Sequence, residues 1–369
     1  MTAGDVIARW AQAQPDADAL VADGRRWSWR ELESEVRRFV DRLAAAGVRE
    51  GDRVAVLSPN RPELIPLFHA AGRLGATWAP LNARLAPREL APLIDRLRPR
   101  VVLADEALAA GVPVAITFAE FAQLPPIEAS AVPSNPERTR ALLFTSGTSG
   151  RPRAVELTES NFAALARASS TNLGADPEQR WLACLPLFHI GGLSMVYRCA
   201  AIGAAVVLQP RFDVDEVARA LREEGITHAS LVPTGLGWVM EKFEAAQENA
   251  PGHLRAILVG GGPMSPELLG RARARGFPVL QTYGLTEACS QVCTERMDAA
   301  DGTSSGEPLE GSSLRIVDAA GREVPAGEIG EIEVRGPTVM RGYFEDPEAT
   351  AEALRDGWLR TRDLGSVDA

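Results

Sequence analysis

Helical segments and short apolar strands alternate along most of this sequence, and that rhythm limits the folds open to the chain. Ser28 and Glu31 have the spacing of a capping box, and apolar residues recur behind them at helical spacing until Gly47, which predicts a first helix. The next predicted elements are strand 53–57, helix 64–74, a strand near Trp78, helix 88–97 and strand 101–103. Apolar strands with short connections favour a largely parallel sheet covered by helices on both faces, which is an α/β fold.

The second half of the chain repeats this unit and then changes character. Further buried strands are predicted at 141–144, 181–189, 204–209, 228–234, 255–262 and 278–280. From Ser312 onward, short alternating strands are separated by Gly and Pro turns, a pattern typical of a small antiparallel sheet or barrel. These strands are predicted at 314–317, 331–334 and 358–361. A chain of 369 residues exceeds the size at which one core usually stops growing, so two or more subdomains are expected.

The net charge, the apolar runs and the cysteines indicate which partners and which compartment to expect. The net charge is −10 and no dense Lys/Arg cluster interrupts it, which argues against a nucleic-acid partner. The first ten residues carry charges and no apolar run, so no signal peptide is expected, and the longest apolar run, 199–208, is about half of a membrane span. Four cysteines without a disulfide framework or zinc-like spacing fit packing roles in a reduced compartment. We therefore expect a cytoplasmic protein without a membrane partner.

A loop rich in glycine and hydroxyl residues follows the predicted strand 141–144. Glycine lets the backbone approach a ligand closely, each hydroxyl adds a donor, and Arg151 and Arg153 add two cations, which together suit an oligophosphate. The P-loop pattern fails here, because its Gly-Lys pair would fall on Pro152 and Arg153. A flexible Gly/Ser linker is the alternative, although such linkers rarely follow a strand and end in Arg-Pro-Arg. The candidate nucleotide-binding residues are Thr145, Ser146, Gly147, Thr148, Ser149 and Gly150.

Two further strand ends offer groups for the same nucleotide. Three consecutive glycines, Gly260, Gly261 and Gly262, suit a flat ring lying against bare backbone, and equally suit a tight turn. The next strand leads into a second candidate stretch, in which an aromatic ring is able to stack on a base. Its residues are Gln281, Thr282, Tyr283 and Gly284.

Acidic and hydroxyl groups complete the predicted site. Thr286 offers a hydroxyl for phosphate, and Glu287 offers a carboxylate for Mg²⁺, a hard cation that takes oxygen ligands. Asp363 is able to accept hydrogen bonds from ribose hydroxyls, as acidic residues do in other nucleotide sites. Taken singly, Glu287 would be a solvated surface acid and Asp363 a turn residue, but their order along the chain favours the functional interpretation.

Two histidines have different predicted roles. His189 is expected at the end of strand 181–189, where sites in α/β folds gather, and it is the candidate catalytic histidine. A histidine that plugs the strand end is the alternative. His69 lies on the apolar face of a predicted helix and is expected to be a core or surface residue.

These motifs together resemble the adenylate-forming superfamily, which comprises acyl-CoA synthetases, luciferases and the adenylation domains of peptide synthetases. The family signatures resemble stretches 142–155, 283–287, 328–336 and 358–365 in order, so the resemblance spans essentially the whole chain. The sequence departs from the family pattern at Arg153, where the family has Lys, and at Ala154 and Arg362, where it has Gly.

The resemblance implies a fold, a reaction and cofactors. The family fold has two doubly wound, largely parallel sheets, expected over about 1–311, and a small antiparallel β-barrel, expected over about 312–369. A mobile C-terminal domain with the family's adenylation lysine is expected to be missing here. The implied reaction activates a small-molecule carboxylate with ATP and Mg²⁺ and transfers it to CoA, and a homodimer is left open. The implied catalytic residues are Thr286, Glu287, His189 and Arg153, with Glu287 at the metal.

Two stretches narrow the substrate within the family. Residues 186–198 and 283–294 are similar to a branch whose substrate carries a second carboxylate, although Gly191 replaces a family serine. Such a substrate needs a cationic or multi-donor anchor, for which Arg198 with Ser290 and Gln291 is the candidate; solvent exposure is the alternative for Arg198. The candidate substrate contacts are His189, Ser194, Arg198, Gly284, Ser290 and Gln291. An aryl- or fatty-acyl-CoA ligase, or an adenylate-binding domain with little ligase activity, are the alternative functions.

Overall fold

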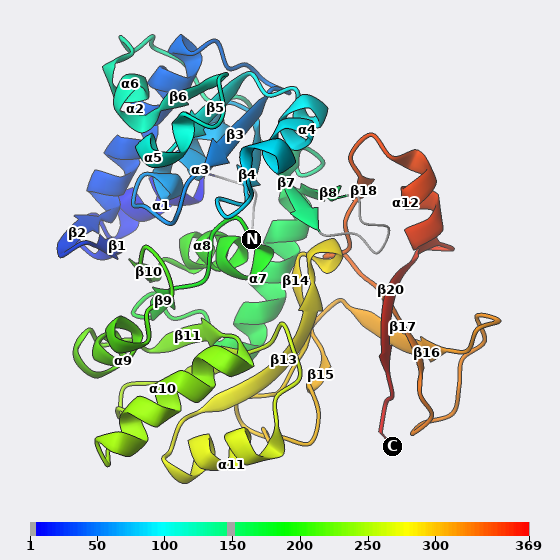
Figure 1. Ribbon diagram of the computed structural model, residues 1–369. Coiled ribbons are helices and arrows are strands. Elements are labelled where there is room, and N and C mark those ends of the chain that lie inside the picture. The colour runs from blue at the N-terminus through cyan, green and yellow to red at the C-terminus, as the bar shows by residue number, and fades with distance from the viewer. Residues whose placement is uncertain (1–4, 146–151, 369) are drawn as a thin grey trace.

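The computed structural model describes residues 5–145 and 152–368, and these residues form an α/β architecture around two large sheets (Figure 1). In this part of the chain the first sheet has seven strands, of which the β7–β8 and β8–β18 pairs are antiparallel and the other pairs are parallel. In spatial order they are β18 (Gly342–Tyr343), β8 (Arg153–Thr158), β7 (Thr139–Thr145), β4 (Thr77–Leu81), β3 (Arg53–Leu57), β5 (Val101–Ala104) and β6 (Ala115–Thr117).

The second sheet has nine strands within the described ranges, and its six middle strands are parallel. In spatial order they are β15 (Glu307–Pro308), β14 (Ser290–Thr294), β13 (Val279–Leu285), β12 (Ala256–Val259), β11 (His228–Leu231), β9 (Arg180–Ala183), β10 (Ala205–Leu208), β1 (Asp18–Ala22) and β2 (Arg25–Ser28). The first strand of the chain, β1, pairs with β2 on one side and with β10 on the other, so both early strands belong to the second sheet, whereas β3 to β6, which follow them in sequence, belong to the first.

Helices cover both sheets, and the longest one begins as its sequence predicts. The Ser28 hydroxyl accepts from the Glu31 amide at 3.3 Å, and the Glu31 carboxylate accepts from the Ser28 amide at 2.8 Å, so the capping box is confirmed. The helices are α1 (Val6–Ala13), α2 (Trp29–Ala45), α3 (Leu64–Arg73), α4 (Pro87–Leu97), α5 (Glu106–Ala109), α6 (Phe118–Gln123), α7 (Glu159–Leu173), α8 (Ile190–Ile202), α9 (Val214–Glu223), α10 (Pro233–Ala245), α11 (Pro266–Ala274), α12 (Pro347–Ala353) and the short 3₁₀ turn η1 (Thr286–Ala288).

One hydrophobic core joins the two large sheets. It contains Trp78 and Leu143 from the seven-stranded sheet and Trp181 and Val206 from the nine-stranded sheet. Helices α7 and α8 lie between the sheets, and α7 contacts β8 on one side and β14 on the other (Figure 1). The four cysteines are free and buried, as predicted. Across the described residues, no helix combines the length and the apolar character needed to cross a membrane.

The third sheet is antiparallel, as predicted, and stands beside the other two (Figure 1). Its strands are β16 (Ser313–Val317), β17 (Gly330–Arg335), β20 (Trp358–Gly365) and β19 (Leu354–Arg355) in spatial order. The two end strands, β16 and β19, do not pair with each other in the described chain, so this is a curled open sheet rather than a closed barrel.

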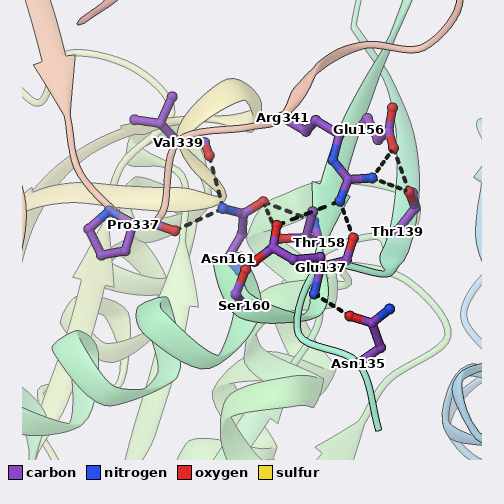
Figure 2. Close-up of polar contacts among 10 residues, drawn as sticks. All are labelled: Asn135, Glu137, Thr139, Glu156, Thr158, Ser160, Asn161, Pro337, Val339 and Arg341. Atoms are coloured by element: carbon purple, nitrogen blue, oxygen red, sulfur yellow. Dashed lines mark hydrogen bonds and ion pairs between the residues drawn. The ribbon is translucent and has the colours of Figure 1, made fainter. Parts of the chain in front are cut away.

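A cluster of polar contacts connects the segment 337–341, which follows the third sheet, to helix α7 and to strands β7 and β8 of the seven-stranded sheet (Figure 2). The Asn161 side-chain amide donates to the carbonyl oxygens of Pro337 and Val339 at 2.8 and 2.9 Å. Arg341 donates to Glu156 at 2.8 Å and to Thr139 at 3.1 Å. The chain then runs into β18, at the edge of the first sheet.

Three predicted strands are too long, and two of them, expected over 228–234 and 255–262, end at Leu231 and Val259. The strand expected to end at His189 ends at Ala183, and His189 is instead the N-cap residue of α8. The apolar run in between made strand and helix hard to distinguish, because a short apolar run fits either element. Gly192 lies in the first turn of α8, where a Cβ would be 2.5 Å from the Pro186 carbonyl oxygen, so the helix packs against the preceding turn without room for a side chain.

Candidate active site

The carboxyl ends of β12 and β13 bring two of the predicted nucleotide-binding stretches together. Val259 pairs with Gln281, so Gly260, Gly261 and Gly262 lie beside the stretch that begins at Gln281. A Cβ on Gly260 would lie 2.7 Å from the Thr282 carbonyl oxygen, whereas a Cβ on Gly262 would meet nothing within 4 Å. The edge therefore presents bare backbone, as a flat ring would require, and the role of these glycines stays a prediction.

The side chains of Gln281 and Thr282 are engaged within the protein. The Gln281 amide donates to the carbonyl oxygens of Gly302 and Ser304 at 3.0 and 3.1 Å. The Thr282 hydroxyl donates to the Cys293 carbonyl oxygen at 2.8 Å. A ligand at this edge would therefore meet the backbone of these two residues rather than their side chains.

Tyr283 and Asp363, the predicted base and ribose contacts, meet in the structure. The Tyr283 hydroxyl on β13 donates to the Asp363 carboxylate on β20 at 2.7 Å, so the third sheet contributes directly to the same site. Burial, followed by the Asp363 carboxylate, raises the pKa of Tyr283, which therefore remains a donor at neutral pH. The preceding Arg362 has a φ of +65°, a left-handed conformation that explains why the family favours glycine at this position.

A bulge at Gly284 turns the chain toward the remaining predicted residues. The β13–β14 register shifts between Tyr283 and Gly284, and a Cβ on Gly284 would lie 1.7 Å from the Ser290 carbonyl oxygen. No side chain fits there. Thr286 and Glu287 follow in η1, and Ser290 has a φ of +102°, so this turn holds a non-glycine residue in an unfavourable conformation.

Arg153 and Glu287 both contact Tyr343, a residue that was not predicted from the sequence. Thr145 pairs with Arg153 across β7 and β8, while Ser146, Gly147, Thr148, Ser149 and Gly150 lie outside the described residues. The Arg153 guanidinium lies 5.2 Å from the Tyr343 ring centre and 3.8 Å from Glu352. The Tyr343 hydroxyl donates to Glu287 Oε1 at 3.1 Å. The predicted phosphate and metal groups are therefore neighbours.

The residues present fit a magnesium ion that arrives with a nucleotide. Mg²⁺ is usually held by one or two carboxylates together with substrate phosphates. Glu287 Oε2 makes no hydrogen bond to the described residues, and within them no group of three or more His, Cys, Asp or Glu side chains could hold a metal alone. Glu287 would therefore serve as the protein ligand, with the remaining oxygens supplied by phosphate and water.

Arg198 is buried, so the alternative that it lies in solvent is wrong. Its side chain is on α8 and the residue is 3% exposed. The guanidinium lies 3.9 Å from the Trp181 ring centre, and Nη1 donates to Ser169 at 3.0 Å and to Gln291 at 3.1 Å. Nε has no hydrogen-bond partner, and among the described residues no carboxylate pairs with Arg198. Burial lowers the pKa of Arg198 to about 10, which still leaves it protonated at neutral pH.

The other predicted substrate residues occupy different environments. Gln291 is 5% exposed and holds Arg198, and Ser194 is buried on α8 one turn before Arg198. Ser290 is half-buried beside Gln291, whereas the His189 side chain is exposed. Partial desolvation of its ring by neighbouring atoms, and then the charge of Arg84, lower the pKa of His189, so the exposed histidine is neutral at pH 7. Ser169 and Trp181, which complete the Arg198 environment, were missed because their sequence context is that of ordinary core residues.

Comparison with known proteins identifies the class of protein that this fold and site define. Residues 7–344 match the model of the AMP-binding enzyme family, so the chain belongs to that family. The resemblance to adenylate-forming enzymes is thereby confirmed.

Individual relatives within this family have named substrates. The 2-succinylbenzoate–CoA ligase of Bacillus cereus is 38% identical over 358 residues, which cover 96% of this chain and 74% of the relative. The o-succinylbenzoate CoA synthetase (MenE) of Bacillus subtilis, in complex with the acyl-adenylate intermediate OSB-AMP, is similar with a TM-score of 0.93 at 34% identity, covering 99% of this chain and 76% of that chain. Its complex with ATP and a magnesium ion has a TM-score of 0.91 at 34% identity, covering 99% and 77%.

His228, which lies beside Trp181 and Arg198, makes the free energy of unfolding depend on pH. The Trp181 ring stacks on His228 with ring centres 4.6 Å apart. Burial, and then the charges of Arg198 and Arg255, lower the pKa of His228 to about 3. An unfolded histidine takes up a proton near pH 6.5, and the folded one does not until about pH 3. The free energy of unfolding should therefore fall as the pH drops between these values, by about 1.4 kcal/mol per pH unit for this residue.

Urea unfolding of the wild type and His228→Phe between pH 7 and 5.5 measures this contribution. Phenylalanine keeps an aromatic ring against Trp181 but cannot titrate, so the pH slope should decrease by about one proton. Burial, Arg140 and Arg73 also lower the pKa of His69, so part of the wild-type slope should remain. Equal slopes for the two proteins would contradict the prediction.

Proposed function

We propose that this protein is an ATP-dependent o-succinylbenzoate–CoA ligase of menaquinone biosynthesis, acting through an acyl-adenylate. Relatives named 2-succinylbenzoate–CoA ligase are 36–38% identical over nearly all of the chain. The observation that carries the proposal is the Arg198 guanidinium, buried without a counter-ion in the described chain. An uncompensated buried cation is costly, and a substrate carboxylate would neutralise it.

The fit between Arg198 and a second carboxylate depends on which nitrogens are free. Ser169 and Gln291 both use Nη1, so the edge that contains Nε is left for a ligand. A guanidinium edge binds a carboxylate through two parallel hydrogen bonds, which gives geometric specificity as well as charge. Arg198 would therefore hold the carboxylate that does not react, and Gln291, which already contacts Arg198, and the adjacent Ser290 would lie beside it.

The reaction has two steps that the predicted residues would support. A carboxylate oxygen of the substrate bonds to the α-phosphorus of ATP, and the bond from that phosphorus to the β-phosphate breaks, releasing pyrophosphate. The CoA sulfur then bonds to the acyl carbon, the thiol proton is lost and AMP leaves. Mg²⁺, when bound, supplies positive charge to the phosphates. Arg153, Thr286 and the 145–150 loop would position the nucleotide and stabilise charge, while His189 would lie near the acyl group.

A pyrophosphate-release screen over carboxylic acids tests the substrate assignment. The expected result is the highest kcat/KM for o-succinylbenzoate, with aryl acids that lack the second carboxylate used poorly. Preference for a monocarboxylic aryl acid or a fatty acid would contradict the proposal and favour one of the alternative ligases.

Three further expectations are proposals: a separate C-terminal domain, a cytoplasmic location and a homodimer. If the adenylation lysine lies outside residues 1–369, these residues alone should bind ATP and acyl-AMP analogues but form acyl-AMP slowly, and rapid formation would contradict that. We also propose a cytoplasmic location, which the four free, buried cysteines support. A homodimer is left open, and light scattering would test it.

A further inference from the structure

Tyr343 contacts both charged groups of the predicted nucleotide site. It lies on β18, where it pairs with Val155 of β8, and its amide donates to the Thr350 hydroxyl at 2.9 Å. Its ring faces the Arg153 guanidinium at 5.2 Å, within the range of a cation–π contact. Its hydroxyl donates to Glu287 Oε1 at 3.1 Å. One half-buried side chain therefore links a cation and an anion that come from distant parts of the chain.

Glu287 is also held through its backbone by the same segment. The Met340 amide donates to the Glu287 carbonyl oxygen at 2.8 Å. That segment is itself fixed by Asn161 and Arg341, whose contacts are drawn in Figure 2. Residues 340–343 thus contact both the backbone carbonyl and the side-chain carboxylate of Glu287.

We propose that Tyr343 is a positioning residue that orients Glu287 toward Mg²⁺ and Arg153 toward the phosphates of ATP. The inference rests on the proposed function, because it assigns the metal and phosphate roles to Glu287 and Arg153. The Tyr343 hydroxyl donates to Oε1 of Glu287. Oε2, which has no hydrogen-bond partner among the described residues, is therefore the oxygen that would bind the metal. Hydrogen-bonded partners of metal-binding carboxylates orient the ligand in this way in other metal sites.

Two substitutions separate the two contacts. Tyr343→Phe removes the hydroxyl and keeps the ring, and Tyr343→Leu removes both. Tyr197→Phe is the matched control, because it removes another Tyr–Glu hydrogen bond, from the Tyr197 hydroxyl to Glu159 at 2.6 Å, outside the predicted site. The probe is a non-hydrolysable ATP analogue, and its affinity is measured by calorimetry with and without Mg²⁺.

The three variants should differ in how Mg²⁺ changes their affinity for the ATP analogue. Tyr343→Phe should reduce the enhancement by Mg²⁺ about tenfold or more, as loss of an outer-shell partner does elsewhere. It should weaken metal-free binding less than Tyr343→Leu, because the ring that supports Arg153 remains although the hydroxyl interaction with Arg153 is also lost. Tyr343→Leu should also weaken metal-free binding, because Arg153 loses its aromatic support. Tyr197→Phe should match the wild type, and melting curves of all three variants establish that they are folded.

Other outcomes identify which idea has failed. If Tyr343→Phe keeps the full Mg²⁺ enhancement, or if Tyr197→Phe loses it equally, Tyr343 has no positioning role. If the wild type binds the analogue without any Mg²⁺ enhancement, the metal role of Glu287 is wrong, and the proposed function fails in that part. A different preferred carboxylic acid in the substrate screen would overturn the substrate assignment and leave the Tyr343 result unaffected.

Discussion

Replacing Arg198 with alanine is expected to lower kcat/KM for o-succinylbenzoate by roughly 30- to 5000-fold. The substitution would leave the second carboxylate of the substrate without its partner in a dry environment, and truncating one member of a buried charge pair costs about 2–5 kcal/mol. The affinity for a stable o-succinylbenzoyl-adenylate analogue should fall over the same range, which allows a measurement that needs no turnover. Benzoate and its adenylate analogue, which lack the second carboxylate, should be handled about as well as before.

Two controls separate a binding role of Arg198 from a structural one. Arg222→Ala removes another arginine that stacks on an aromatic ring, Phe243, at 4.3 Å and outside the predicted site, so it should leave both substrates unaffected. Arg198→Met keeps much of the side-chain volume and removes a buried, uncompensated charge, so it should not lower the melting temperature. If both substrates suffer equally in Arg198→Ala, Arg198 supports the fold rather than the substrate.

Replacing Arg153 with alanine is expected to weaken ATP binding by roughly 10- to 150-fold. A hydrogen bond to a charged group contributes about 1.5–3 kcal/mol, and Arg153 lies at the start of β8, immediately beyond the loop at 145–150. Its contact with Glu352 is long, at 3.8 Å, so the guanidinium is available to a phosphate. A preformed acyl-AMP, which lacks the pyrophosphate half, should bind nearly as tightly as in the wild type.

Calorimetry with a non-hydrolysable ATP analogue and with an acyl-AMP analogue compares the two ligands directly. Arg153→Lys restores the residue of the family pattern and should retain most of the ATP affinity. Equal weakening of both ligands by Arg153→Ala would place Arg153 near the acyl or adenosine group instead.

Local signals were sufficient for much of the fold. The capping box at Ser28 and the apolar spacing behind it predicted α2, because both depend on residues within a few turns of one another. The strand expected to reach His189 was wrong, because a short apolar run fits a strand or a helix equally well, and α8 begins directly after His189. The membership of β1 in the second sheet has no local signal at all.

The site was predictable where residue type and order along the chain indicate the chemistry, and not where partners come from distant elements. Tyr283, Glu287 and Asp363 were identified from their residue types and order, and the structure brings Tyr283 and Asp363 into contact. Arg198 could not be assigned as buried, because Ser169 and Gln291 lie 29 and 93 residues away in sequence. Tyr343 was missed because Glu287, 56 residues away, is what gives it a role.

The pairing of β1 with β10 has a consequence for how the protein is made. Trp10 donates to the Ala200 carbonyl oxygen at 2.8 Å, and that acceptor is 190 residues later in the chain. At about 5–20 residues per second, the ribosome needs roughly 10–40 s to supply it. During that interval β1 and β2 have no neighbouring sheet, and their hydrogen-bonding edges and apolar faces are available to other nascent chains. Translation speed and chaperone supply should therefore affect the yield of this protein more than its final stability would suggest.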